Sequence, residues 1–283
     1  MPKLTDKVVV ITGASGGIGR ETALAFAREG AVLVLADVNE EPLRELAEQI
    51  EADGGEAIAV PTDVSKRDEM ERLMQAAVDR FARVDILLNN AGFGLGATIE
   101  QTSEEDFRSL WETNVLGVMF GMQAALRIMR RQESGHIISV SSAAGRIGYP
   151  GIGAYSATKS AVIAMTEALR AEVADAGIHA SVVLPIGTDT PFFETARSVD
   201  GVPVGPHGPV QSPAHVARRI VACARRPTVE VVPSKRLRLG IILNALFPAL
   251  LAAIGRRAYR RIQQRRAAIT TAAGGEQKEA SRG

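Results

Sequence analysis

The stretch VVVITGASGGIG, residues 8–19, decides the fold that this chain is expected to adopt. Its first four residues are apolar and β-branched, which is typical of a buried strand, and a helical pattern begins at Arg20. Between the two stand Gly13, Gly17 and Gly19. A strand, a glycine-rich turn and a helix in this order present backbone N–H groups to a diphosphate. Taken alone, the motif also fits an ordinary turn.

A second strand-like run, residues 32–36, leads directly into Asp37. Asp37 follows the glycine turn by about twenty residues, where an acidic side chain accepts hydrogen bonds from the adenosine ribose. The same carboxylate repels a 2′-phosphate, and the next residue, Val38, offers no positive charge to bind one. The sequence therefore predicts NAD as the cofactor in preference to NADP. A helix cap or a solvated loop acid is the alternative role for Asp37.

Tyr155 and Lys159 occupy the ends of the stretch YSATK, and Ser142 lies thirteen residues before Tyr155. Residues four apart share one face of a helix, so the ammonium of Lys159 can sit beside the phenol. A nearby cation is expected to lower the phenol pKa from about 10 toward 7, which requires roughly 4 kcal/mol. The pair thus predicts a tyrosine general acid/base. On its own it also fits surface packing.

The rest of the chain alternates between strand-like and helical patterns. Strands are expected near residues 8–12, 32–36, 57–61, 84–89, 136–141, 179–184 and 229–232. Ser65, Ser103 and Ser212 are expected to cap the helices that follow them. This alternation predicts an α/β fold of Rossmann type, a doubly wound parallel sheet of about seven strands with helices on both faces.

The domain organisation follows from length and composition. Residues 1–233 are expected to form one catalytic domain, and residues 234–269 a basic and apolar helical extension. Residues 270–283 have the composition of a disordered tail.

Together these motifs resemble the short-chain dehydrogenase/reductase superfamily, which consists of NAD(P)-dependent oxidoreductases with one Rossmann-type domain. The resemblance covers residues 5–233 and keeps the family's order and spacing. The matching segments are Thr12–Gly19, Asp63-Val64, Asn89-Asn90-Ala91-Gly92, Asn114, Ser141-Ser142 and Tyr155-x-x-x-Lys159.

The resemblance implies a catalytic role for four residues. Tyr155 is the acid/base, Lys159 lowers its pKa and holds the nicotinamide ribose, and Ser142 binds the substrate oxygen. Asn114 holds a water in the proton relay. Ser142 and Tyr155 thus form the substrate contacts. Simpler alternatives are a strand-end serine for Ser142 and a solvent-facing residue for Asn114.

The resemblance also implies a set of cofactor contacts, in which Asp63 and Val64 flank the adenine and Asn90 lies along the ribose. The full set is Gly13, Ser15, Gly17, Ile18, Gly19, Asp37, Asp63, Val64, Asn90, Tyr155, Lys159, Pro185, Thr188 and Thr190.

One departure from the family pattern follows Pro185, where Ile186 replaces the usual glycine. Because a β-branched residue disfavours positive φ, this loop is expected to be reshaped. The expected contacts of Thr188 with the carboxamide and of Thr190 with a phosphate depend on that loop.

These features predict an NAD-dependent oxidoreductase that interconverts a secondary alcohol and a ketone. Residues 189–208, with Phe192 and Phe193, are expected to form an apolar lid, and residues 94–96 another wall, which favours a hydrophobic substrate. A non-catalytic NAD-binding sensor or scaffold is the alternative. By resemblance, a homo-oligomer, either dimer or tetramer, is expected.

The net charge of +1 conceals two oppositely charged parts. Residues 234–283 carry eleven Lys/Arg and two Asp/Glu, which gives a charge of +9. Residues 1–233 carry 22 Lys/Arg and 30 Asp/Glu, which gives a charge of −8. Within the basic part lies an apolar run of sixteen residues, 239–254, which is shorter than the roughly 20 that span a bilayer. Residues 235–266 are therefore expected either to lie on a membrane surface or to pack on the enzyme or a partner subunit.

Other classes of function are not expected. The basic cluster is interrupted by the apolar run and has little aromatic content, so it does not fit nucleic acid. The single cysteine, Cys223, excludes an internal disulfide framework, and the four histidines lack metal-ligand spacing, so no metal is expected. Residues 1–7 contain no apolar signal region, which predicts a cytoplasmic protein. Peripheral membrane association through the extension is one of its two alternatives, and packing on the enzyme or a partner subunit is the other.

Overall fold

A computed structural model describes most of the chain. The described residues are 4–199, 202, 204–205, 210–249, 252–253, 255–257 and 259–260. The tail expected at residues 270–283 lies outside them, as do parts of the expected lid and of the extension.

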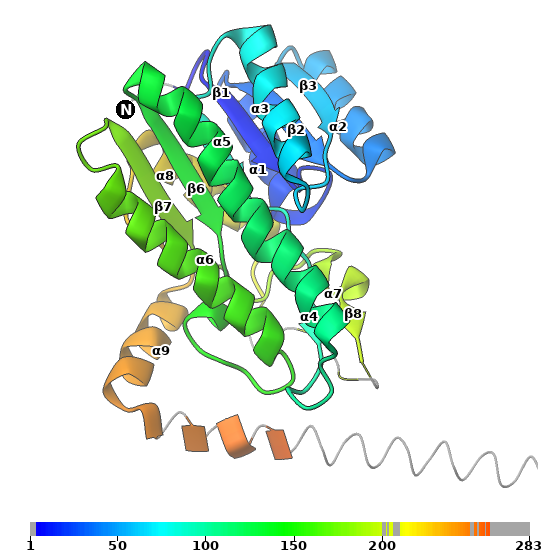
Figure 1. Ribbon diagram of the computed structural model, residues 1–283, viewed down its shortest axis with the longest axis vertical. Helices are drawn as coiled ribbons and strands as arrows, with labels where there is room; N and C mark the ends of the chain where they lie inside the picture. The colour runs from blue at the N-terminus through cyan, green and yellow to red at the C-terminus, as the bar shows by residue number, and fades with distance from the viewer. Residues whose placement is uncertain are drawn as a thin grey trace, which may run out of the picture.

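Seven parallel strands form the central sheet (Figure 1). In spatial order they are β3 (Glu56–Pro61), β2 (Val32–Asp37), β1 (Val8–Thr12), β4 (Ile86–Asn89), β6 (Gly135–Val140), β7 (Ile178–Val183) and β9 (Glu230–Val231). Val10 of β1 pairs with Val34 on one side and Leu87 on the other. All seven expected strands are confirmed, with ends that differ by at most two residues.

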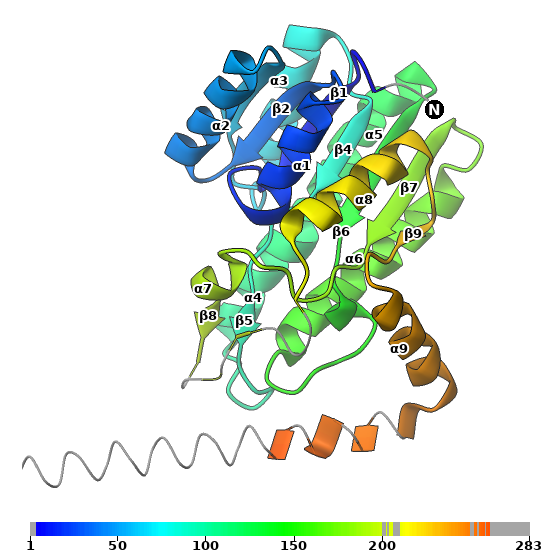
Figure 2. The same ribbon diagram turned by 180° about the vertical axis from the view of Figure 1, so that it is seen from behind.

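Helices cover both faces of the sheet (Figures 1 and 2). One face carries α1 (Gly17–Ala27), α2 (Glu40–Ala52) and α8 (Pro213–Arg225), and the other α3 (Arg67–Phe81), α5 (Gly117–Gln132) and α6 (Gly153–Glu172). Their apolar stripes form the two layers of the core. Phe26, Leu43 and Ile220 are fully buried in one layer, and Met70, Leu73 and Val162 in the other. The Rossmann-type fold predicted from the sequence is confirmed.

Two of the three expected serine caps are present. The Ser103 hydroxyl accepts from the backbone of Asp106, where α4 (Glu104–Trp111) begins, and the Ser212 hydroxyl caps α8. The prediction for Ser65 is wrong, because Lys66 occupies the cap position of α3. The Ser65 hydroxyl instead donates to Asp63 at 2.6 Å.

The strands all point toward the end of the molecule where α4, α7 (Phe192–Thr195) and α9 (Lys235–Leu246) lie (Figure 1). The chain winds outward from β1 through β2 to β3 and then returns to β4 on the other side of β1. This reversal of strand order between β1 and β4 creates a crevice at the carboxyl ends, the usual place for a ligand in such sheets.

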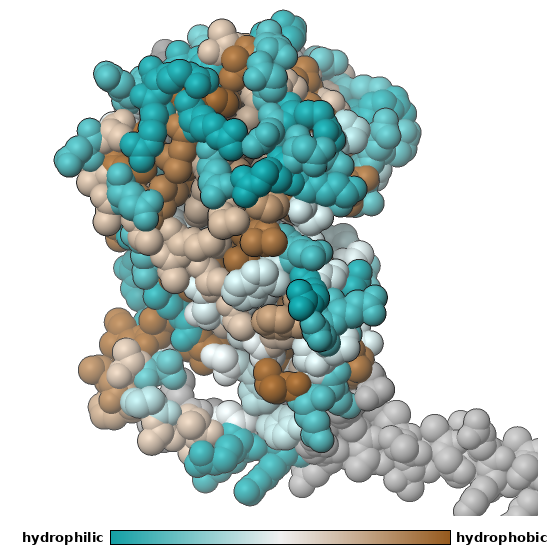
Figure 3. All heavy atoms as spheres, viewed as in Figure 1, coloured by the Kyte–Doolittle hydropathy of each residue, from teal (hydrophilic) through white to brown (hydrophobic). Residues whose placement is uncertain are grey.

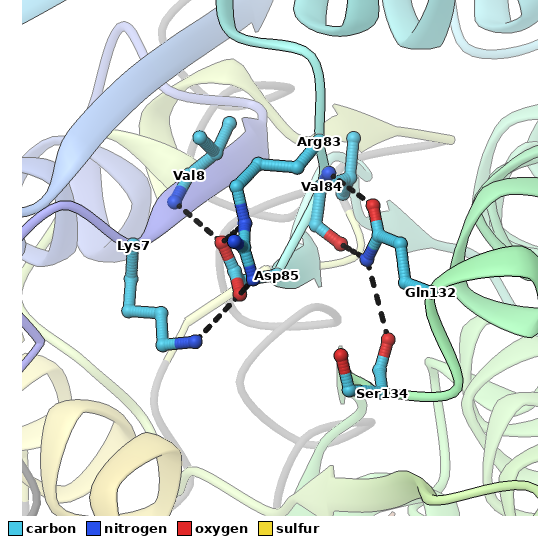
Figure 4. A network of polar contacts seen from close by, with 7 residues as sticks. All are labelled: Lys7, Val8, Arg83, Val84, Asp85, Gln132 and Ser134. Atoms are coloured by element: carbon cyan, nitrogen blue, oxygen red, sulfur yellow. Dashed lines mark hydrogen bonds and ion pairs between the residues drawn. The ribbon is translucent and has the colours of Figure 1, made fainter.

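A polar network ties the sheet together at the opposite end (Figure 4). Asp85, just before β4, is only 6% exposed and accepts hydrogen bonds from Lys7, Arg83 and the Val8 backbone. Burial alone would raise the pKa of Asp85, but the bonds from Arg83 and Lys7 outweigh it and hold the pKa below its usual range. The carboxylate thereby links β1 to the segment that starts β4.

The extension leaves the sheet after β9 and forms α9 at the carboxyl edge (Figure 2). Within the described part of the chain, α9 included, no helix combines the length and apolarity needed to cross a membrane.

Candidate active site

A cleft of about 1500 Å³ opens along the carboxyl edge of the sheet. Most of the residues predicted from the sequence line this one cleft. They are Gly13, Ser15, Gly17, Ile18, Asp37, Asp63, Val64, Asn90, Ser142, Tyr155, Lys159, Pro185, Thr188 and Thr190. Gly19 and Asn114, also predicted, lie behind this lining and support it.

The glycine turn is shaped by close backbone approach. Gly13 and Gly17 have φ values of +64° and +53°, which glycine adopts without strain. A Cβ atom on Gly19 would overlap the carbonyl oxygen of Gly13 and lie 2.8 Å from the Asn90 amide nitrogen. That amide donates to the carbonyls of Thr12 and Gly13 at 3.0 and 2.9 Å. The turn therefore presents an open, glycine-lined floor to the cleft.

Asp37 closes one end of the cleft at the tip of β2. Its carboxylate accepts a hydrogen bond from the Ser15 backbone at 3.2 Å and from the Asn39 backbone and side chain at 3.0 Å. The neighbouring Val38 is largely exposed and also lines the cleft. The carboxylate is thus held in place beside the glycine turn, with an apolar neighbour.

Tyr155 lies in the first turn of α6 at the other end of the cleft, facing Ser142 at the end of β6. Burial raises the pKa of Tyr155 to about 12, while its hydrogen bond with the Ser142 hydroxyl acts in the opposite direction. The phenol is therefore protonated at neutral pH. Ser142 itself is held by its hydroxyl, which accepts from the Ala144 backbone at 3.1 Å.

Lys159 follows one turn later on the same face of α6 and is only 4% exposed. Its ammonium donates to the Val140 carbonyl at 3.1 Å and lies 5.8 Å from the centre of the Tyr155 ring. Burial lowers the pKa of Lys159 to about 8. Desolvation of the phenol outweighs the opposing hydrogen bond with Ser142, so the net pKa of Tyr155 lies above its usual value, and the lowering contribution of Lys159 stays a prediction.

Asn114 lies in a π-helical turn, Glu112–Leu116, between α4 and α5 and is fully buried. Its side-chain oxygen accepts from the Phe93 backbone, and its nitrogen donates to the Phe93 carbonyl and the Thr158 hydroxyl. Thr158 in turn donates to the Tyr155 carbonyl at 2.8 Å. The side chain thus joins the loop after β4 to the helix that carries Tyr155. Its contact with a relay water stays a prediction.

The loop after β7 accommodates Ile186 without backbone strain, since its φ is not positive. The Ile186 side chain packs against the cluster formed by Leu184 and Leu237. Thr188 donates to the Ile186 carbonyl at 2.9 Å, and Thr190 lies against the glycine turn at Gly17. Both threonines therefore still reach the cleft despite the departure from the family pattern.

Aromatic side chains form the outer part of the cleft. The Phe192 ring of α7 lies 5.8 Å from the Tyr155 ring, and the Phe193 ring lies 5.6 Å from Phe192. The expected wall at residues 94–96 is misplaced: β5 (Leu95–Gly96) is buried and pairs with β8 (Arg197–Ser198). Among the described residues of that loop region, the lining comes from Phe93, Thr98 and Ile99 instead.

Comparison with known proteins agrees with this geometry. Residues 7–200 match the family model described as short chain dehydrogenase. The chain belongs to the short-chain dehydrogenase family. A 3-oxoacyl-[acyl-carrier-protein] reductase from Synechocystis is 35% identical over 236 residues, which cover 82% of this chain and 94% of the relative.

Two further members extend the comparison. A diacetyl reductase from Staphylococcus epidermidis is 40% identical over 181 residues, covering 64% of this chain and 70% of the relative. The crystal structure of a short-chain dehydrogenase/reductase from Burkholderia phymatum in complex with NAD superposes with a TM-score of 0.82 at 29% identity. That superposition covers 89% of this chain and 97% of the other. As a family member, the protein is an oxidoreductase.

The sequence did not point to two threonines that hold this dehydrogenase site together. The Thr12 hydroxyl accepts from the backbones of Asn90 and Ala91, so it fixes the loop after β4 to the glycine turn. Thr158 connects Asn114 to the start of α6. Each lies inside a recognised motif, but the distant partner that it binds, Asn90 or Asn114, is at least 44 residues away in sequence. Position within a motif was therefore the available signal.

Proposed function

We propose that the protein is an NAD-dependent oxidoreductase that interconverts a secondary alcohol and a ketone. The observation that carries this proposal is the convergence of Ser142, Tyr155 and Lys159 at one end of a cleft whose other end holds the glycine turn and Asp37. A dinucleotide fits the glycine turn, because Gly13, Gly16 and Gly17 line the cleft there without side chains that would fill it.

NAD is the cofactor that this end of the cleft favours. Asp37 is fixed by Ser15 and Asn39, so its carboxylate stays where a ribose 2′-hydroxyl is bound and a 2′-phosphate is repelled. Val38 adds no positive charge there. The NAD complex of the Burkholderia phymatum relative supports a nicotinamide cofactor. When bound, the cofactor accepts or supplies the hydride of the reaction.

The side chains at the other end handle the substrate oxygen and its proton. Ser142 binds the oxygen, and Tyr155 donates a proton to it during ketone reduction or takes one during alcohol oxidation. Lys159 is placed beside Tyr155 to bind the nicotinamide ribose with the N–H groups that Val140 does not use.

A ketone or secondary alcohol with an apolar body fits the outer cleft. Phe192, Phe193 and Ile147 contribute apolar surface there, next to the Tyr155 phenol. The names of the diacetyl and 3-oxoacyl reductase relatives also describe ketone substrates. By resemblance we further propose that the protein forms a homo-oligomer, which light scattering can test. We also propose that residues 1–233 are the catalytic domain and residues 234–269 the extension.

A substrate panel tests the proposed reaction. Purified protein is mixed with short and long secondary alcohols and NAD, or with the matching ketones and NADH, and the absorbance of reduced nicotinamide is followed. We expect turnover that increases with alkyl length and is higher with NAD(H) than with NADP(H). Tight NAD binding without turnover across the whole panel would favour a sensor or scaffold instead.

A further inference from the structure

We propose that the outer face of α9 docks the protein on an anionic lipid surface, with the mouth of the cleft beside that surface. The lipid contact is independent of the proposed reaction, whereas the placement of the cleft mouth rests on the proposed substrate site.

The two faces of α9 have different surroundings. On the inner side, Leu237 is buried with Leu184 and Val232, and Ile241 packs against the same cluster. On the outer side, a stripe of large apolar side chains is exposed to solvent. Its members are Leu239 at 58%, Ile242 at 50%, Leu243 at 38%, Leu246 at 65% and Phe247 at 54%. Figure 3 shows this brown surface gathered over α9 at the lower left.

Such a stripe is unusual on a protein that stays in water. Single exposed leucines are common, but a contiguous apolar patch on one helix marks a place where something binds. The stripe is about two and a half turns long, which suits a helix lying in the plane of a membrane interface and not one that crosses it.

Charge identifies the occupant as an anionic surface. Exposed cations flank the stripe at both ends: Lys235, Arg236 and Arg238 before it, and Arg256, Arg257 and Arg260 after it. Neither α9 nor the described residues after it contain an acidic side chain. Each basic residue near an anionic bilayer contributes about 1 kcal/mol.

The charge of the rest of the chain orients the molecule. Residues 1–233 carry a net charge of −8 and are repelled by anionic lipid, while residues 234–283 carry +9 and are attracted. The extension therefore turns toward the lipid and the sheet domain away from it.

A second copy of the chain is a poorer occupant for the same stripe. In a two-fold symmetric contact the same patch meets itself. Because cations flank the stripe at both ends, either helix orientation would bring the basic groups of two copies together. An anionic surface has no such conflict.

The same helix borders the cleft, which links the docking surface to the active site. Arg236, Leu237, Gly240 and Asn244 of α9 line the cleft, and Ile186 in the loop after β7 packs on the cluster that seats α9. Ile186, which departs from the family pattern, thus forms part of the apolar surface on which the extension packs. A protein resting on the outer face of α9 has its cleft opening beside the lipid.

Vesicle co-sedimentation of the full chain tests the proposal. The vesicles are phosphatidylcholine alone or phosphatidylcholine mixed with phosphatidylglycerol, at low and high salt. We expect binding to the mixed vesicles, weak binding to phosphatidylcholine, and less binding at high salt because exposed charges are screened.

Two matched double variants separate the apolar face from net charge. Leu239→Glu with Ile242→Glu, and Arg218→Gln with Arg219→Gln on the exposed surface of α8, each change the net charge by two in the same direction. The α9 variant is expected to lower the partition coefficient about tenfold or more. The α8 variant is expected to stay within about twofold. NAD titration confirms that both variants are folded.

Three results would overturn the proposal. The first is no binding of the unmodified protein to mixed vesicles at low salt. The second is an equal loss in both double variants, which would mean charge alone and no docking face. The third is a combination of two observations: the unmodified protein does not bind vesicles, and the α9 variant forms a smaller assembly than the unmodified protein in light scattering. That combination would assign the stripe to a contact with a second copy of the chain. None of these readouts needs turnover, so a failed docking surface is distinguishable from a failed assignment of the reaction.

Discussion

Replacing Lys159 with methionine is expected to stabilise the cofactor-free protein at neutral pH, although it removes a proposed catalytic residue. Methionine has a similar length and shape but no charge to desolvate. Burial lowers the pKa of Lys159 from its ordinary 10.5 to about 8. At 1.36 kcal/mol per unit of pKa, the buried ammonium costs about 3 kcal/mol of folding free energy. The variant also loses the hydrogen bond to the Val140 carbonyl, which lowers its stability by about 1 kcal/mol.

The pH dependence follows from the two pKa values. Between pH 8 and about 10.5 the unfolded chain still holds the Lys159 proton, while the folded protein has released it. The free energy of unfolding of the unmodified protein therefore increases with pH across this window, relative to the variant. The variant is expected to be more stable by about 2 kcal/mol at pH 7 and slightly less stable above pH 10.5.

Urea unfolding of both proteins at equal concentration, at pH 7 and at pH 10, measures this difference. Other titrating groups are shared, so they cancel in the comparison. A variant that is less stable at pH 7, or a difference that does not change with pH, would refute the reasoning. NAD binding should be weakened in the variant, which separates the stability effect from the function of the lysine.

Three other substitutions test the glycine turn, the polar network at Asp85 and the preference for NAD over NADP. Gly19→Ala should weaken NAD binding about tenfold or more, because its Cβ would overlap the Gly13 carbonyl, and an unchanged Kd for NAD would contradict this argument. Asp85→Asn should lower the free energy of unfolding at pH 7 by about 3 kcal/mol. The Asp85 effect should decrease as the pH falls below about 4 and be lost as the pH passes through the lowered pKa of Asp85, because the carboxylate contributes only while it is ionised. Equal stability of the two proteins at pH 7 would contradict this role. Asp37→Ala should narrow the preference for NAD over NADP in binding titrations, and equal affinity of the unmodified protein for both cofactors would refute the role of Asp37.

The sequence predicted the sheet well because its strands are buried on both faces. Runs such as residues 8–11 and 32–36 are continuously apolar, and the helices between them carry clear apolar stripes. Residues 234–249 were harder to interpret. Their apolar content fitted several environments, and the inner and outer faces of α9 became distinguishable only once Leu237 and Ile241 were seen against the core.

The positions of the site residues could be predicted from spacing, but their electrostatics could not. Spacing places Lys159 beside Tyr155, yet it does not reveal that desolvation dominates both pKa values. The hydroxyl contacts of Thr12 and Thr158 depend on segments brought together by the fold. Ser65 shows the same limit, since its hydroxyl donates a hydrogen bond to the nearby carboxylate of Asp63 and does not cap a helix.

The central claim is that Tyr155 transfers the proton of the reaction, and Tyr155→Phe tests it most directly. The substitution removes only the hydroxyl, so the ring that packs near Phe192 is retained. With a substrate identified from the panel, we expect kcat to fall by about a hundredfold or more, the usual contribution of a general acid/base, while the Kd for NAD stays within about twofold. A Phe variant that turns over substrate at nearly the unmodified rate would contradict the claim.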